Sequence, residues 1–226
     1  MSALVPVSDS IWVVAAPFSF FGLHIGSRMT VIRLRDGSLA LHSPVAVDTP
    51  LVADIDALGE VRHIICPNSF HHLFAADAVT IWPQATLYGP RALQRKRRDL
   101  TFQATLGEPL PAALASDFEA VSIAGSLLNE TVLFHRDSGS LIAADLIENF
   151  PSCDHAPTRW YLKINGALGQ PTWPRAMRAL YWRRDLARAS IERILAWPVE
   201  RVILAHGEII EGNARDALRQ GLAWLR

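Results

Sequence analysis

The chain has few cysteines, no net charge and no long apolar run. Its 226 residues include two cysteines, Cys66 and Cys153, which are too few for a disulfide framework. Lys plus Arg and Asp plus Glu each number 22, whereas a dedicated nucleic-acid-binding protein usually has a basic excess. The most apolar early stretch, residues 11–23, is shorter than the ~20 residues that span a bilayer. We therefore expect a soluble, cytoplasmic protein that binds neither nucleic acid nor membranes.

Apolar residues make up 50% of the chain and charged residues 19%, a composition that excludes a disordered protein. Short apolar runs with strand character alternate with helical patterns. The predicted strands are residues 11–16, 29–34, 38–43, 61–66, 85–88, 118–123, 131–135, 141–144 and 202–205. The predicted helices begin near residues 49, 69, 90, 187 and 213, and residues 151–174, with four prolines, are predicted to form an irregular insert. This alternation indicates an α/β protein with a mixed sheet.

Several polar side chains follow predicted strands, where functional groups of α/β proteins tend to lie. They are His42, Asn68, His71, His72, Asp145, His206 and Glu208. Histidine and aspartate are ligands for Zn²⁺ and similar ions. A single histidine after a strand is more often a cap or a hydrogen-bonded core residue, so the order of the whole set decides between the two interpretations.

That order resembles the metallo-β-lactamase superfamily. There, a hairpin ends in an acidic loop, a later strand ends in T-H-x-H-x-D-H, and a G-H, a lone Asp and a final G-H follow. The segment 64–72, Ile-Ile-Cys-Pro-Asn-Ser-Phe-His-His, matches the second feature, Asp145 the lone Asp and His206 the final His. The resemblance implies a four-layer αββα sandwich with two mixed β-sheets. It also implies one domain over residues 1–226, with similar halves at about 1–112 and 113–226.

The chain departs from the family pattern at three positions that share one metal ion. Pro67, Ser69 and Ser126 stand where the family has histidines, in the register that places Cys66 at the Thr of the motif. A shift of the register by one residue would leave fewer ligands. Proline offers no donor atom, and serine hydroxyls are not typical ligands of Zn²⁺. The resemblance therefore argues against a two-metal site.

The positions of the other metal ion hold His71, His72, Asp145 and His206, and all four can coordinate. The resemblance thus implies one divalent ion, Zn²⁺, Fe²⁺ or Mn²⁺, in a shell of three histidines and one carboxylate. Such a site would serve a metal-dependent hydrolase of a small ester, thioester or lactone. The alternative is a metal-free binding or assembly protein that has kept the fold and lost catalysis.

Under the hydrolase hypothesis, Asp145 or Glu208 would accept a proton during attack, and Asn68 or His42 would donate to an oxyanion. The basic run at residues 95–98 is interpreted as a solvated helix face. Trp160 and Trp173 lie in the predicted insert, where they would roof a pocket, form the interface of a homo-oligomer, or simply pack between helices and sheet.

Overall fold

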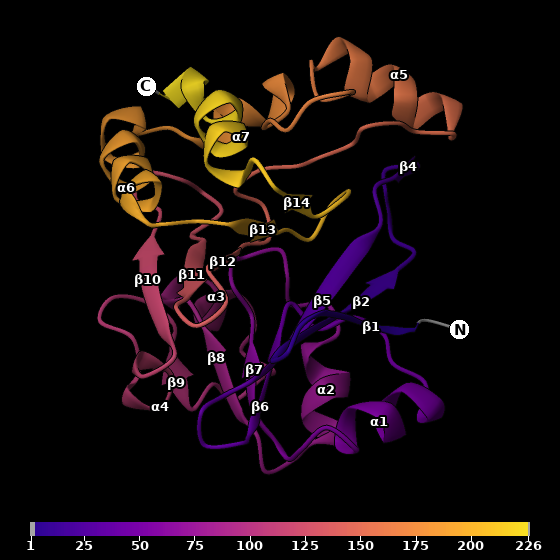
Figure 1. Ribbon diagram of the computed structural model, residues 1–226, viewed down its shortest axis with the longest axis vertical. Coiled ribbons are helices and arrows are strands. Elements are labelled where there is room, and N and C mark those ends of the chain that lie inside the picture. Colours follow the sequence, from indigo (N-terminus) through magenta and orange to yellow (C-terminus); the bar gives the residue numbers. More distant parts are fainter. Residues whose placement is uncertain (1–2, 226) are drawn as a thin grey trace.

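Two β-sheets lie between two layers of helices in the computed structural model, which describes residues 3–225 (Figure 1). The larger sheet contains β1 (Leu4–Ser8), β2 (Ile11–Ala16), β5 (Ser27–Arg33), β6 (Leu39–His42), β7 (Val61–Ile65), β8 (Thr86–Gly89) and β9 (Ala104–Thr105), in that order. The smaller sheet contains β10 (Phe118–Ser122), β11 (Thr131–His135), β12 (Ser140–Ile142), β13 (Arg201–Ile203) and β14 (Ile210–Glu211). Strands β3 (Ser19–Phe20) and β4 (Leu23–His24) form a separate hairpin.

Helices and 3₁₀ turns surround the two sheets. They are α1 (Thr49–Asp56), α2 (Ala75–Ile81), α3 (Arg91–Lys96), α4 (Ala112–Ala115), α5 (Ala156–Ile164), α6 (Arg184–Ala196) and α7 (Ala214–Gly221), with 3₁₀ turns η1 (Arg175–Leu180) and η2 (Ala223–Leu225). Figure 1 shows α1 and α2 at the bottom beside the larger sheet, and α6 and α7 at the top beside the smaller one. No helix in the described part of the chain combines the length and apolarity needed to cross a membrane.

Three apolar clusters separate the four layers, because neighbouring residues of a strand point to opposite faces. In β7, Ile64 packs toward α1 and α2, whereas Ile65 packs between the sheets. In β12, Leu141 packs toward α6 and α7, whereas Ile142 meets Ile65 in the cluster between the sheets. Each such fully buried side chain contributes about 1.5–3 kcal/mol relative to an exposed one. The sandwich therefore follows from strands that are apolar on both faces.

Each sheet contains a parallel pair of strands at its centre. Strand β6 pairs with β7 in parallel, with His42 opposite Ile65, and β12 pairs with β13, with Ile142 opposite Ile203. Strands β7–β8 and β8–β9 are also parallel pairs, whereas β5–β6, β11–β12 and β13–β14 are antiparallel, so both sheets are mixed. Because parallel strands end at the same edge, residues that follow β6 and β7, or β12 and β13, come together.

The predicted α/β class with two mixed sheets is confirmed, with two corrections to its elements. Residues 151–174 are not wholly irregular: they contain α5, whose second residue, Pro157, suits the first turn of a helix. The helix expected from residue 69 begins at Ala75, because residues 68–74 form turns fixed by the side chain of Asn68. The single domain with two similar halves stays a prediction.

Candidate metal centre

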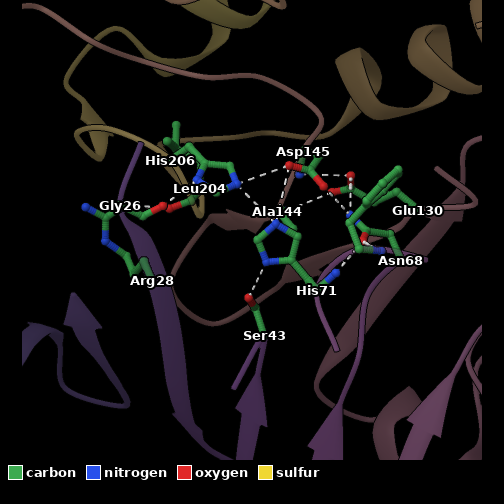
Figure 2. Close-up of polar contacts among 11 residues, drawn as sticks. Gly26, Arg28, Ser43, Asn68, His71, Glu130, Ala144, Asp145, Leu204 and His206 are labelled. Carbon is green, nitrogen blue, oxygen red and sulfur yellow. Dashed lines mark hydrogen bonds and ion pairs between the residues drawn. The ribbon is translucent and has the colours of Figure 1, made fainter. Parts of the chain in front are cut away.

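Three side chains from both sheets converge where the parallel strands end. His71 follows β7, Asp145 follows β12 and His206 follows β13, and Figure 2 shows the three pointing toward one another. The Nε2 atom of His71 lies 3.2 Å from Nε2 of His206 and 3.3 Å from Oδ1 of Asp145. Nε2 of His206 lies 3.3 Å from the same carboxylate oxygen. The three atoms thus form a nearly equilateral triangle.

The size of this triangle matches the requirement of a tetrahedral metal ion. Ligand atoms about 2.0–2.1 Å from a tetrahedral ion lie about 3.3–3.4 Å from one another. The observed separations of 3.2–3.3 Å are close to this value. Two imidazole nitrogens and one carboxylate oxygen are also a donor set that Zn²⁺, Fe²⁺ and Mn²⁺ accept. The three residues therefore fit one divalent ion as its three protein ligands.

The second ring nitrogen of each histidine has a partner that orients the ring. Nδ1 of His206 lies 2.7 Å from the carbonyl oxygen of Gly26, which can only accept, so Nδ1 carries a proton. Nε2 of a neutral His206 is then a lone-pair donor aimed at the cluster. Nδ1 of His71 lies 2.7 Å from Oγ of Ser43. Partners of this kind fix the tautomer and orientation of metal-binding histidines.

Ser43 holds an unusual backbone conformation at the end of β6. Its φ angle is +57°, a left-handed value that non-glycine residues rarely adopt. Such a conformation costs roughly 1–2 kcal/mol and persists only where the surroundings require it. The side chain that it directs inward is buried and bonds His71. The strain is thus located at the residue that orients a proposed ligand.

Asn68 and Glu130 form a buried support beneath Asp145. The side-chain oxygen of Asn68 accepts from the backbone N–H groups of Phe70 and His71, which fixes the turn that carries His71. Its Nδ2 donates to Oδ2 of Asp145 at 2.8 Å and to Glu130 at 3.3 Å. Because both amide protons are engaged, Asn68 has none left for an oxyanion, and we assign it to positioning.

Glu130, which the sequence analysis did not select, is fully buried. Its two oxygens accept from the backbone N–H groups of Ala144 at 2.7 Å and Asp145 at 2.9 Å. These bonds fix the backbone that carries Asp145. The sequence signal that could have identified it is an acidic residue directly before a strand with an apolar centre, Val132 to Phe134, because a carboxylate buried beside such a strand must be hydrogen-bonded.

The cluster is electrostatically polarised. Burial alone would raise the pKa of Asp145, but the charges and hydrogen bonds of His71 and His206 outweigh it and hold the pKa well below its usual range. Burial lowers the pKa of His206, but the hydrogen bond and charge of Asp145, with Glu148, raise it to about 8. Burial and the charge of Asp145 raise the pKa of Glu130 to about 8. Asp145 is thus the carboxylate that keeps its charge at this centre.

Other residues selected from the sequence lie apart from this triangle. Nδ1 of His72 faces the guanidinium of Arg97 at 2.9 Å, and its buried Nε2 has no hydrogen-bond partner within residues 3–225. Burial and the charges of Lys96 and Arg97 lower its pKa to about 4. The side chain of Glu208 is exposed, and its backbone bonds Asn149. His42 is buried with its Nε2 likewise unpartnered in the described chain.

Pro67, Ser69 and Ser126, which the resemblance aligns with family histidines, make structural hydrogen bonds. The N–H of Ser69 donates to the carbonyl of Leu128 at 2.9 Å, and the N–H of Thr131 donates to the carbonyl of Pro67 at 3.0 Å. The hydroxyl of Ser126 accepts from the N–H of Leu128 at 3.2 Å. These residues therefore tie two loops together and offer no strong metal ligand.

The cluster forms part of the wall of a cavity of about 470 Å³. This volume falls within the ~300–1,000 Å³ of small-molecule sites. Glu148 and Trp173 also line it, and burial raises the pKa of Glu148 to about 7. Of the two tryptophans predicted to roof a pocket, Trp173 is buried against the cavity, whereas Trp160 is exposed on α5.

Comparisons with known proteins agree on the fold. Residues 8–92 match a family described as a domain of unknown function (DUF4336), which is less than half of the chain. A search of curated proteins finds no sequence match. A metallo-β-lactamase from Pontibacter korlensis superposes with a TM-score of 0.70 at 12% identity, covering 100% of this chain and 99% of that one. One from Hirschia baltica has a TM-score of 0.68 at 12% identity, covering 99% and 97%.

A metal-soaked Flv1 flavodiiron core from Synechocystis is also similar, with a TM-score of 0.69 at 11% identity, covering 99% of this chain and 60% of that one. At such low identity the likeness establishes the architecture and not the activity. The chain therefore has the metallo-β-lactamase fold, which confirms the predicted four-layer αββα class.

Proposed function

We propose that this protein is a metal-dependent hydrolase with one divalent ion held by His71, Asp145 and His206. The observation that carries the proposal is the 3.2–3.3 Å triangle of their donor atoms in the wall of a cavity. Catalytic zinc sites commonly have three protein ligands and one open position. His72, the fourth ligand implied by the sequence resemblance, stays outside the proposed set because the ligand atoms that lie within 4.8 Å of one another are those of His71, Asp145 and His206.

When bound, such an ion supplies a Lewis acid and makes hydroxide available near neutral pH. The residues of the chain have separate tasks in the hydrolysis of an ester or lactone. The oxygen of water bonds to the acyl carbon, the bond from that carbon to the leaving oxygen breaks, and a proton passes to the leaving oxygen. Glu148 faces the cavity and is placed to carry that proton, while Asn68 and Ser43 hold Asp145 and His71 in position.

The test is metal content together with hydrolysis. Untagged protein, dialysed free of chelator and reconstituted with Zn²⁺, Mn²⁺ or Fe²⁺, is expected to hold about one ion per chain by elemental mass spectrometry. Asp145→Ala and His206→Ala should each lose that ion and the hydrolysis of p-nitrophenyl esters or lactones, with the circular dichroism of the fold retained. Less than about a tenth of an equivalent with every metal would refute the hydrolase.

That outcome would favour the second candidate, a metal-free binding or assembly protein. Its supporting observation is that Pro67, Ser69 and Ser126 make backbone or structural hydrogen bonds where the superfamily resemblance expects ligands.

A further inference from the structure

The cavity beside the metal centre has a predominantly apolar wall. Ten of its lining residues have apolar side chains, among them Phe20, Phe70, Leu128 and Trp173. The polar groups that line it include the triangle of His71, Asp145 and His206, and Glu148. A site of this composition binds a ligand through its apolar surface and orients it through few polar groups.

The apolar wall extends from the surface to the interior. At the surface, Phe20 on the β3–β4 hairpin is 43% exposed, and Phe70, which precedes α2, is 42% exposed. Deep in the protein, Trp173 and Leu128 are each 1% exposed. The hairpin that carries Phe20 is anchored to α5, because the N–H of His24 donates to Thr158 at 2.8 Å. The apolar wall thus includes both surface and interior side chains, and its surface hairpin is anchored to α5.

The scarcity of positive charge in the cavity wall excludes polyanionic substrates. Among the described residues of the wall, Lys96 is the one with a permanent positive charge. Its Nζ already donates to the carbonyl of Ser69 at 2.8 Å and lies 5.5 Å from the ring centroid of Phe70. A polyanion such as a nucleic acid or a nucleotide requires several cations, so it does not fit this cavity.

We propose that the substrate is an ester, thioester or lactone with a long apolar acyl chain. The chain lies along the path from Phe20 and Phe70 to Trp173, and the carbonyl lies at the metal centre. This inference rests on the proposed hydrolase. Each methylene of a chain that enters an apolar cavity contributes about 0.8 kcal/mol, which is a factor of about four in the dissociation constant.

The first experiment measures binding without metal or catalysis. Metal-free protein is titrated with straight-chain primary amides from butanamide to dodecanamide, which carry the carbonyl and no charge, and binding is followed by tryptophan fluorescence or calorimetry. The Kd is expected to fall about fourfold per methylene until the cavity is full. A Kd that does not change with chain length overturns the proposal.

Adjacent phenylalanines of the hairpin provide a matched control. Phe20 lines the cavity, whereas Phe21 is 92% exposed and does not. Phe20→Ser and Phe70→Ser are expected to raise the Kd of dodecanamide by about tenfold each, and Phe21→Ser by less than about twofold. Because Phe20 and Phe70 are both more than two-fifths exposed, their replacement should leave the fold intact. An equal loss in all three variants places binding elsewhere and overturns the proposal.

A hydrolysis arm separates this inference from the proposed function. Reconstituted protein is assayed with p-nitrophenyl butanoate and p-nitrophenyl decanoate. If both esters are hydrolysed at equal kcat/KM and amide binding does not depend on chain length, the protein is a hydrolase but its substrate does not need a long acyl chain. Binding that depends on chain length, with no metal bound and no hydrolysis, rejects the hydrolase and reassigns the cavity to binding of an acyl ligand. Preference for the decanoate, lost in Phe20→Ser but not in Phe21→Ser, supports both.

Discussion

Two regions at the strand ends are held together differently. Side chains join the proposed metal centre (the side-chain side), and backbone groups join residues 67–69 to the 126–131 loop (the backbone side). His71, Asp145 and His206 meet through two imidazole nitrogens and a carboxylate oxygen. Ser69 and Pro67 instead reach the 126–131 loop through N–H and carbonyl groups. Because almost every residue type supplies those groups, the backbone side tolerates changes of sequence, whereas the side-chain side depends on residue identity. The region around Pro67 and Ser69 therefore keeps its geometry without metal-binding side chains.

The largest expected difference between the two sides is in metal binding. His71→Ala removes a donor atom and is expected to weaken Zn²⁺ binding by more than about 100-fold, since even an outer partner of a ligand contributes about 10–100-fold. Ser69→Ala, two residues away, removes a hydroxyl that has no hydrogen-bond partner among residues 3–225 and keeps the backbone bond to Leu128. It should bind Zn²⁺ as the wild type does in a competition titration with a chromophoric chelator. Equal weakening in both variants would contradict the comparison.

The next-largest effect on Zn²⁺ binding is expected when Ser43 is replaced, because its hydroxyl hydrogen-bonds the ring of His71. Ser43→Ala removes the partner of His71 Nδ1 and is expected to weaken Zn²⁺ binding by about 10–100-fold. Ser43→Gly removes the same hydroxyl but accepts the φ angle of +57° without strain. If loss of the hydroxyl weakens the site, both variants bind Zn²⁺ equally weakly. Ser43→Gly then unfolds at a higher urea concentration than Ser43→Ala. Full affinity in Ser43→Gly would assign the loss to backbone strain instead.

A smaller effect, on stability, is expected at Glu130. Glu130→Gln leaves one carbonyl oxygen where two oxygens accept the N–H groups of Ala144 and Asp145, and it turns an amide NH₂ toward a donor. The free energy of unfolding should fall by about 1–3 kcal/mol, the cost of a buried donor without an acceptor. Urea denaturation measures this, with Glu192→Gln on the exposed face of α6 as the neutral control. An unchanged midpoint would show that water replaces the lost acceptor.

The smallest effect is expected at His42, which ends β6 on the side-chain side but whose Nε2 has no partner among residues 3–225. Burial, with the nearby charge of His71, lowers its pKa to about 3, while an unfolded histidine titrates near 6.5. Between these values the unfolded state binds more protons, so stability is lost as the pH falls below about 6.5.

The corresponding measurement is the unfolding free energy at about pH 7.5 and about pH 5.5. The wild type is expected to lose about 1.4 kcal/mol more than His42→Leu on acidification, because one histidine contributes about that amount over one pH unit below its unfolded pKa. Comparison with the variant cancels the opposite contributions of Glu148 and His206, whose pKa values are raised. Identical losses in the two proteins would show that His42 is protonated in the folded state.

The α/β class with a mixed sheet could be predicted because the strands are short apolar runs with turn signals between them, whereas the four-layer sandwich is implied by the resemblance to the metallo-β-lactamase superfamily. Asp145 and His206 could be selected as site residues because each follows a strand of a parallel pair. The hairpin of β3 and β4 and the helix α5 could not, because their stability depends on contacts such as that between His24 and Thr158.

Side-chain direction within a turn is not readable from sequence spacing. His71 and His72 are adjacent and chemically identical, yet the first points into the cluster and the second toward Arg97. That choice depends on Asn68, which fixes the turn, and on Ser43, which lies 28 residues earlier and holds the ring. Glu130 was missed because its role depends on two backbone groups that follow another strand.

The bond between His206 and the carbonyl of Gly26 joins residues 180 positions apart in the chain. Arg28 extends the same link by donating to the carbonyls of Leu204 and Gly207, and Gly207 has no room for a side chain, since a Cβ would lie 1.9 Å from the carbonyl oxygen of Asn149. Contacts of such high sequence separation form only after the intervening chain has closed its loops. We therefore expect the centre to form late in folding, and a bound ion would report that segments from both ends of the chain have come together.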